Sequence, residues 1–217
     1  MANVADGSND DPDLLQIVAI GDPVLRRPAD PVDPSLIVTP AFQRLIDQMR
    51  ATMIAAPGVG LAAPQVGQGI RLAVIEDSPE RWIDLDPTVL AERERTEVAF
   101  TVLINPVVER ITDGGEVMFY EGCLSVPGYA GAVERSRTVR LTALDADGEP
   151  FSAIYTGWPA RIVQHEVDHL DGRIYVDRVA TRSLSSTDNL AKWRGRPIAE
   201  LAEELGFTLS AGQAGSG

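Results

Sequence analysis

Cysteine and histidine are scarce in this chain of 217 residues, which contains one cysteine, Cys123, and two histidines. A single cysteine excludes a disulfide within the chain and is typical of proteins in a reducing compartment. Residues 1–13 are polar and acidic, unlike a signal peptide. Residues 53–70 carry no charge but contain two prolines and four glycines, which disfavours a membrane-spanning helix. We therefore expect a soluble, cytoplasmic protein.

Positive charge is also in short supply. The chain has 19 Lys and Arg against 32 Asp and Glu, which gives a formal net charge of -13. Such a surface repels phosphate backbones and anionic lipid, and no local basic patch is evident, so we expect no direct binding to nucleic acids or membranes. The hydrophobic share of 44% is that of an ordinary globular protein, and the length fits one domain with extensions.

Apolar periodicity predicts an α+β fold, with short antiparallel strands around a central helix at residues 158–170. Two other helices are expected, one after Thr39-Pro40 and one over residues 197–205. A hairpin is predicted to turn at Asp147-Gly148. The other predicted strands cover residues 14–20, 72–75, 98–104, 107–111, 117–120 and 173–176.

The same pass along the chain predicts its domain boundaries. We expect a catalytic domain over residues 14–179 and a C-terminal extension with a short helix over residues 180–209. Residues 1–13 and 210–217 have the composition of disordered tails. Residues 77–97 are rich in charge and predict a surface excursion with one helical turn after Pro87.

The strongest functional pattern is the run QHEVDH at residues 164–169. His165 and His169 lie one turn apart on the same face of a helix, so both can bind one metal ion, and Glu166 between them is placed as a general base. The alternative is a chance occurrence on a solvated helix, but every histidine of the chain falls in this motif. Asp168 points about 100° away from His169, and we expect it to be structural.

A catalytic metal site needs a third protein ligand. Cys123 lies in EGCLS, residues 121–125, in a glycine-containing turn after a predicted strand. On this motif alone, a ligand and a small buried apolar side chain are equally good interpretations. The run GVGLAAPQ, residues 58–65, opens like a dinucleotide-binding fingerprint, but it follows a helix and contains Pro64. By itself it indicates a glycine-rich turn.

Together and in this order, GVGLAAPQ, EGCLS and QHEVDH resemble the three signature motifs of the peptide deformylase family. The resemblance extends over about residues 14–179 and includes IGDPVLR at residues 20–26. No signature position is substituted. The excursion at residues 77–97 looks longer than usual for the family, and the stretch after residue 179 falls outside the resemblance.

The resemblance implies that Cys123, His165 and His169 bind one divalent ion, most often Fe²⁺, with Zn²⁺, Ni²⁺ or Co²⁺ able to replace it. The residues alone indicate only an ion that accepts one thiolate and two imidazoles. The implied reaction is hydrolysis of the N-formyl group of N-terminal formyl-methionine on newly made polypeptides. Water activated by the metal ion attacks, Glu166 acts as general acid and base, and formate is released.

The resemblance also implies how the substrate is held. It assigns the Gln65 side chain and the Leu124 backbone amide as donors to the substrate oxygen, and the Gly60 backbone as a contact of the peptide. Glu121 either supports a metal ligand or forms a structural ion pair. Phe119 adjoins the motifs, but we expect it to be core. The candidates for an apolar pocket around the methionine side chain are Val59, Trp158 and Ile162.

Two other functions fit parts of the pattern. A zinc endopeptidase would use the histidine motif, but its third ligand is expected downstream as Glu or His, whereas the candidate here is an upstream cysteine. A non-enzymatic metal-binding module would need a fourth protein ligand, and the chain has no spare Cys or His. The expected partners of the favoured function are formyl-methionyl nascent peptides, with the ribosome as a further candidate.

Overall fold

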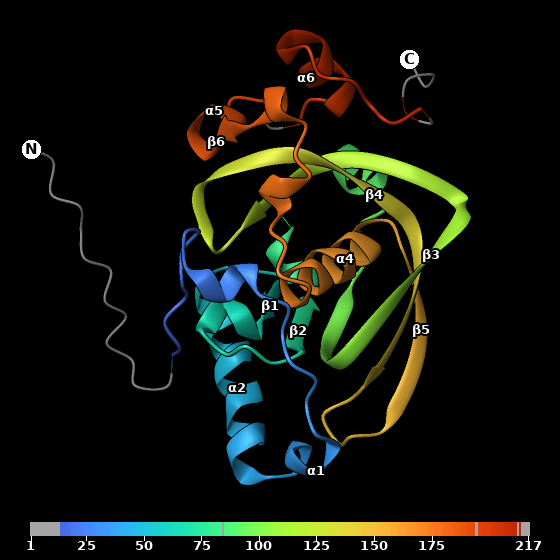
Figure 1. Cartoon of the computed structure of the whole chain (residues 1–217). Coiled ribbons are helices and arrows are strands. Elements are labelled where there is room, and N and C mark those ends of the chain that lie inside the picture. Colours follow the sequence, from blue (N-terminus) through green and yellow to red (C-terminus); the bar gives the residue numbers. More distant parts are fainter. Residues whose placement is uncertain (1–13, 84, 194, 212, 214–217) are drawn as a thin grey trace, which may run out of the picture.

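An antiparallel sheet of six strands curves around one central helix, α4, in the computed structural model (Figure 1). The structure describes residues 14–83, 85–193, 195–211 and 213. The strand order is β1-β2-β3-β4-β5, and β6 pairs with β4 outside this path. The strands are β1 (Gly60–Ala62), β2 (Leu72–Asp77), β3 (Val98–Cys123), β4 (Val126–Leu144), β5 (Pro150–Thr156) and β6 (Ser185–Ser186). The predicted α+β class is confirmed.

Two of the strands are much longer than the sequence predicted. The three strands expected at residues 98–104, 107–111 and 117–120 all lie within β3. The predicted breaks between them are shifts of register against β4, at Ile104/Val107 and at Ile111/Glu116. Such irregularities bend a strand without ending it. This bending lets β3 and β4 wrap around α4.

The hairpin of β4 and β5 agrees with the prediction. Val139 lies opposite Tyr155, and Leu141 lies opposite Ala153. Val139 and Leu141 are fully buried, as the alternation of apolar and polar residues requires for one covered face. One core cluster therefore lies between this hairpin and α4, and a second one packs α2 against β1 and β2.

The strands predicted at residues 14–20 and 173–176 are wrong. The first segment makes one backbone hydrogen bond to each of two separate segments, from Val18 N to Gln65 O and from Ile20 N to Ser125 O. No β-ladder of hydrogen bonds forms. The second contains a 3-10 turn, Tyr175–Asp177, in which the Asp177 side chain accepts from the Ile174 amide. A local side-chain acceptor here replaces strand pairing.

The predicted helices are all present. Helix α2 (Pro40–Ala55) begins as expected, with the Thr39 hydroxyl accepting from the Phe42 amide. Short helices at Pro34–Ile37 (α1), Pro87–Glu92 (α3) and Thr187–Ala191 (α5) accompany α4 (Trp158–Leu170) and α6 (Ile198–Leu205). None of the helices in the described ranges has the length and apolar character needed to cross a membrane.

The C-terminal extension lies across the outer side of the bent strands β3 and β4, away from α4 (Figure 1). Ile198 and Leu201 of α6 pack with Met118 and Phe119 of β3 in one apolar cluster. We call the excursion, residues 77–97, and the extension, residues 180–209, together the outer layer. They meet where the Ile198 amide donates to Glu92.

The tails predicted at the two ends fall mostly outside the described residues, which exclude residues 1–13, 212 and 214–217. Within the described part, Ser210 is buried. The Gln213 side chain accepts from the Met118 amide and donates to the Met118 carbonyl, so it pairs with the edge of β3 as a strand would.

Candidate active site

Helix α4 is anchored to the sheet at its start, where the Gly157 amide donates to the Arg137 carbonyl of β4, and again at its middle. Gly157 precedes it with φ 65, and a Cβ there would overlap Glu94 of the excursion, so glycine is needed for both conformation and space. About two turns later, the Gln164 side chain accepts from the Ser136 amide and donates to the Ser136 carbonyl. These contacts fix how far α4 can slide or rotate against β4.

Three potential metal ligands meet at the C-terminal half of this helix. One ligand atom from each of Cys123, His165 and His169 lies within 4.8 Å of the other two. The Cys123 Sγ and His169 Nε2 atoms are 3.3 Å apart. Ligand atoms on one tetrahedral ion at ordinary bond lengths are about 3.5 Å apart, so the group fits a single ion. The remaining described residues offer no other such group of histidine, cysteine and carboxylate side chains.

Glu121 fixes the orientation of one of these ligands. His165 Nδ1 lies 2.9 Å from Glu121 Oε2. A carboxylate only accepts, so Nδ1 must carry the proton and Nε2 is left to bind a cation. Glu121 also accepts from Arg135 Nε and Nη2, both at 2.9 Å. The two roles considered for Glu121 are therefore combined: it orients His165 and forms a structural ion pair.

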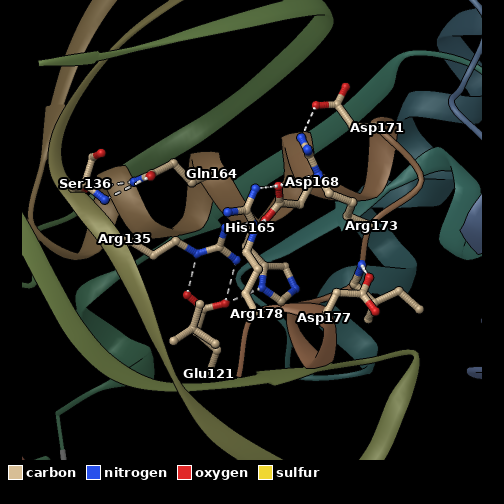
Figure 2. Close-up of polar contacts among 12 residues, drawn as sticks. Glu121, Arg135, Ser136, Gln164, His165, Asp168, Asp171, Arg173, Asp177 and Arg178 are labelled. Carbon is tan, nitrogen blue, oxygen red and sulfur yellow. Dashed lines mark hydrogen bonds and ion pairs between the residues drawn. The ribbon is translucent and has the colours of Figure 1, made fainter. Parts of the chain in front are cut away.

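Behind Glu121 lies a buried network of charges (Figure 2). Arg135 is 4% exposed and bridges Glu121 to Asp168, the residue beside His169. Arg161, one turn before His165 on α4, donates to Glu121 Oε1 at 2.6 Å and to the Val133 carbonyl at 2.8 Å. A buried charge is tolerated when it is paired and hydrogen-bonded in this way.

The sequence prediction missed Arg135 and Arg161. Arg161 is a charged residue within an otherwise apolar stretch on the packed face of a helix, whereas Arg135 lies among other charged and polar residues in a strand. A charge at a position that must be buried indicates a buried counter-charge. That pattern could have identified Arg161 but not Arg135, and it would not have said which carboxylate Arg161 pairs with.

The surroundings shift the pKa values of the site in opposite directions. Burial would raise the pKa of Glu121, but Arg135 outweighs it and holds that pKa well below the usual range. Burial raises the pKa of Glu166 to about 7, against the lowering effect of His165. Glu121 therefore stays ionised as an acceptor, whereas Glu166 can take up and release a proton near neutral pH.

The two histidines also differ. Burial lowers the pKa of His169 well below its usual range, so its ring is neutral. Burial alone would lower the pKa of His165 too, but its hydrogen bonds to Cys123 and Glu121 raise it well above the usual range. The sulfur and the carboxylate thus favour a positive charge at this position, which a bound cation satisfies as well as a proton.

Gln65 points its amide at the same centre. Its Oε1 accepts from the Ala62 amide at 2.9 Å, which directs Nε2 toward Cys123 Sγ at 3.4 Å and Ser125 Oγ at 3.3 Å. The bonds from Val18 to Gln65 O and from Ile20 to Ser125 O tie this loop to the EGCLS turn. The irregular segment mispredicted as a strand therefore holds two motifs together.

A cavity of about 620 Å³ opens beside the ligand group. His169 contacts Cys123 and is 1% exposed. Phe119 lies in an apolar cluster, as expected for a core residue. The Glu166 Oε2 atom is buried and has no hydrogen-bond partner among the described residues. A Cβ at Gly60 would overlap the Glu166 carboxylate. The other predicted site residues line this cavity, namely Val59, Gly60, Gln65, Cys123, Leu124, Trp158, Ile162, His165 and Glu166.

A curved antiparallel sheet around a helix, with two histidines and a cysteine that can hold one metal ion and an unpaired glutamate beside them, is the arrangement of a metal-dependent hydrolase. The polypeptide deformylase family matches residues 14–184. Peptide deformylase 3 of Streptomyces avermitilis is 50% identical over 200 residues, which cover 90% of this chain and 85% of that protein. The chain belongs to the peptide deformylase family.

Solved structures agree with this assignment. A class I type b peptide deformylase from Acinetobacter baumannii, crystallised with Met-Ala-Ser, matches with a TM-score of 0.67 and 34% identity, over 76% of this chain and 98% of that one. A peptide deformylase from Synechococcus elongatus in complex with actinonin matches with a TM-score of 0.63 and 36% identity, over 89% of this chain and 87% of that one.

Proposed function

We propose that this protein hydrolyses the N-formyl group of N-terminal formyl-methionine on newly made polypeptides and releases formate. The observation that carries the proposal is the unpaired Glu166 carboxylate beside three converging ligand atoms, at the wall of one cavity. Membership of the peptide deformylase family supports the same reaction and disfavours an endopeptidase or a purely structural metal module.

Cys123, His165 and His169 would hold one divalent ion, for which we propose Fe²⁺. When bound, such an ion acidifies a water molecule and polarises the formyl carbonyl. Glu166 takes the proton of the attacking water and delivers it to the departing amine nitrogen. The formyl carbon gains the water oxygen, and the C–N bond breaks to give formate and a free amino terminus.

The remaining site residues bind and orient the substrate. Nε2 of Gln65 and the backbone amide of Leu124 donate to the formyl oxygen as negative charge develops on it. The Gly60 backbone contacts the peptide, and the absence of a side chain there leaves room for Glu166. The walls that receive the methionine side chain are apolar, formed by Val59, Trp158 and Ile162.

Formate release from formyl-Met-Ala-Ser tests the proposal, with acetyl-Met-Ala-Ser as the matched control. The formyl carbon carries only hydrogen, and the narrow space beside Gly60 and Leu124 should exclude a methyl group. We expect a much lower kcat/KM for the acetyl peptide. Comparable values for the two peptides would indicate a general aminoacylase, and cleavage of casein would indicate an endopeptidase. Cytoplasmic location and contact with the ribosome remain predictions of this proposal.

A further inference from the structure

A second cavity, of about 280 Å³, lies between β3 and the two parts of the outer layer. Its walls include Val89 of α3, Phe119 of β3, and Leu190 and Leu201 of the extension. The family match ends at residue 184, so α5 and α6 contribute a wall from outside the matched region. The volume is just below the range of about 300–1,000 Å³ for small-molecule pockets, which suits one side chain better than a whole ligand.

Arg93 sets the chemistry of this cavity. Its guanidinium carbon lies 5.2 Å from the ring centre of Trp158 and 6.0 Å from that of Phe119. Nε of Arg93 is buried, and among the residues that the structure describes it has no hydrogen-bond partner. Aromatic faces attract a cation but do not accept its N–H groups. The guanidinium therefore retains donors for an anionic group.

Among the described residues, the other charged side chains that line this cavity already have partners. Arg196 donates to Glu200 at 2.6 Å. Asp86 caps α3 by accepting from the Thr88 amide. Glu92 accepts from the Ile198 amide at 3.4 Å, and its charge acts on Arg93 without a hydrogen bond between them. Arg93 is thus the group best placed to bind a carboxylate from outside the chain.

The second cavity adjoins the catalytic one. Thr187 lines both of them. Trp158 lines the catalytic cavity, and its ring also contacts Arg93 in the second cavity. The two cavities are therefore adjacent, as the binding of one peptide in both of them requires.

We propose that Arg93 binds the carboxylate of an Asp or Glu side chain downstream of the first residue of the substrate, so that the protein favours acidic nascent chains. This inference rests on the proposed deformylase function. A glutamate fits the cavity because its methylene groups can pack on the apolar walls while its carboxylate reaches the guanidinium. Inorganic anions would leave those walls uncovered.

The test uses formyl-Met pentapeptides of Ala and Ser in which one Glu, or one Gln as its neutral isostere, is moved through positions two to five. With the metal-loaded full-length protein, we expect kcat/KM to be about tenfold higher for Glu than for Gln at one position. Arg93→Met should reduce this ratio to about one, and Arg93→Lys should restore part of it. The control, Arg196→Met, should keep the ratio because Arg196 is already paired.

A Glu-to-Gln ratio of one at every position in the wild-type protein overturns the inference, even if neither Arg93 variant can be purified. A Glu-to-Gln ratio that stays high in Arg93→Met also overturns it. A ratio that falls to one in Arg196→Met would show that Arg196, and not Arg93 alone, binds the carboxylate, which contradicts the inference as well. In each case, formate release from the neutral Gln peptide would still support the proposed function. Absence of formate release from every peptide contradicts the proposed function itself.

Discussion

Helix α4 and the outer layer contact the same strands but are held there by different forces. Beneath α4, Glu121 and Arg135 form a buried ion pair in which both side chains are 3% exposed. In the outer layer, α6 is held by apolar contacts of Ile198 and Leu201. Most outer ion pairs are open to solvent, as in the pair of Glu94 with Arg137, at 39% and 42% exposure. The exception is the pair of Asp77 with Arg95, which is buried where the excursion leaves β2.

The difference explains what each region can do. A buried network works only with particular residues at particular positions, because one missing partner leaves an uncompensated charge. Such a network holds His165 in a fixed direction through the hydrogen bond between its Nδ1 and Glu121. Apolar packing tolerates exchange of side chains of similar volume, so the outer layer can vary while keeping its place. The outer layer is therefore suited to adjusting which peptides bind.

The largest expected effect comes from Glu166→Gln in the inner region. Glu166 carries a proton in the proposed reaction but is not among the ligand atoms, so the variant should keep its metal and its fold. General acid–base groups contribute about 10²–10⁴-fold to the rate, and we expect kcat to fall by that factor. Formate release and metal content are the measurements, with the exposed Glu203→Gln as the control. A variant within a few-fold of wild type would contradict the role of Glu166.

Next in size is Glu121→Gln, which tests whether buried charge holds α4. The change keeps the shape of the side chain but leaves Arg161 without its anionic acceptor and Arg135 with Asp168 alone. Breaking a buried ion pair from one side costs about 3–5 kcal/mol. Urea unfolding of the metal-free protein should show this loss in the free energy of unfolding. A loss below about 1 kcal/mol, the range of surface pairs, would mean that the network does not stabilise the helix.

The inner region could be predicted from the sequence because its chemistry lies in short motifs. The spacing of His165 and His169 fixes their common face on a helix whatever the rest of the fold. Cys123 and Gln65 could be assigned only with the resemblance, since no spacing rule brings three distant segments together. Arg135 could not be assigned, because its pairing with Glu121 depends on the register of β3 against β4.

The structure of the outer layer could be predicted less fully from the sequence, for a physical reason. The helix at residues 197–205 was predicted from its apolar stripe, but α5 has no buried residue and leaves no such pattern. Arg93 looked like one charge among many in the excursion. Its burial arises only when α3, Trp158 and the extension come together, and these contacts join segments far apart in the chain. The long β3 was divided in the prediction because a register shift and a chain break look alike in sequence.

Leu201→Ala probes the apolar attachment of the outer layer and should have a smaller effect. Leu201 is 4% exposed and packs in the cluster with Phe119. Truncating a buried leucine costs about 2–5 kcal/mol, and we expect the lower end because α6 lies at an edge of the domain. Hydrogen exchange should increase in α6 and not in α4. Leu201→Met, which conserves volume, is the control, and faster exchange throughout α4 would show that the two regions are not independent.

The smallest expected effect is that of Glu94→Gln, which repeats the change made at Glu121 in the other region. Glu94 accepts from Arg137 Nε at 2.6 Å and from Nη2 at 2.9 Å, so its bonding geometry matches that of Glu121 with Arg135. The two pairs differ chiefly in exposure, and water and salt screen the outer pair.

Glutamine keeps the side-chain volume of Glu94, and it leaves the backbone at φ 49 and the contact with Gly157 unchanged. We expect a loss of about 0.2–1 kcal/mol in the free energy of unfolding, shrinking further as salt is raised. The loss for Glu121→Gln should respond much less to salt, because that pair is out of contact with solvent. Urea unfolding of both variants at low and high salt gives the comparison directly. Equal losses, or equal salt dependence, would show that burial is not what separates the two regions.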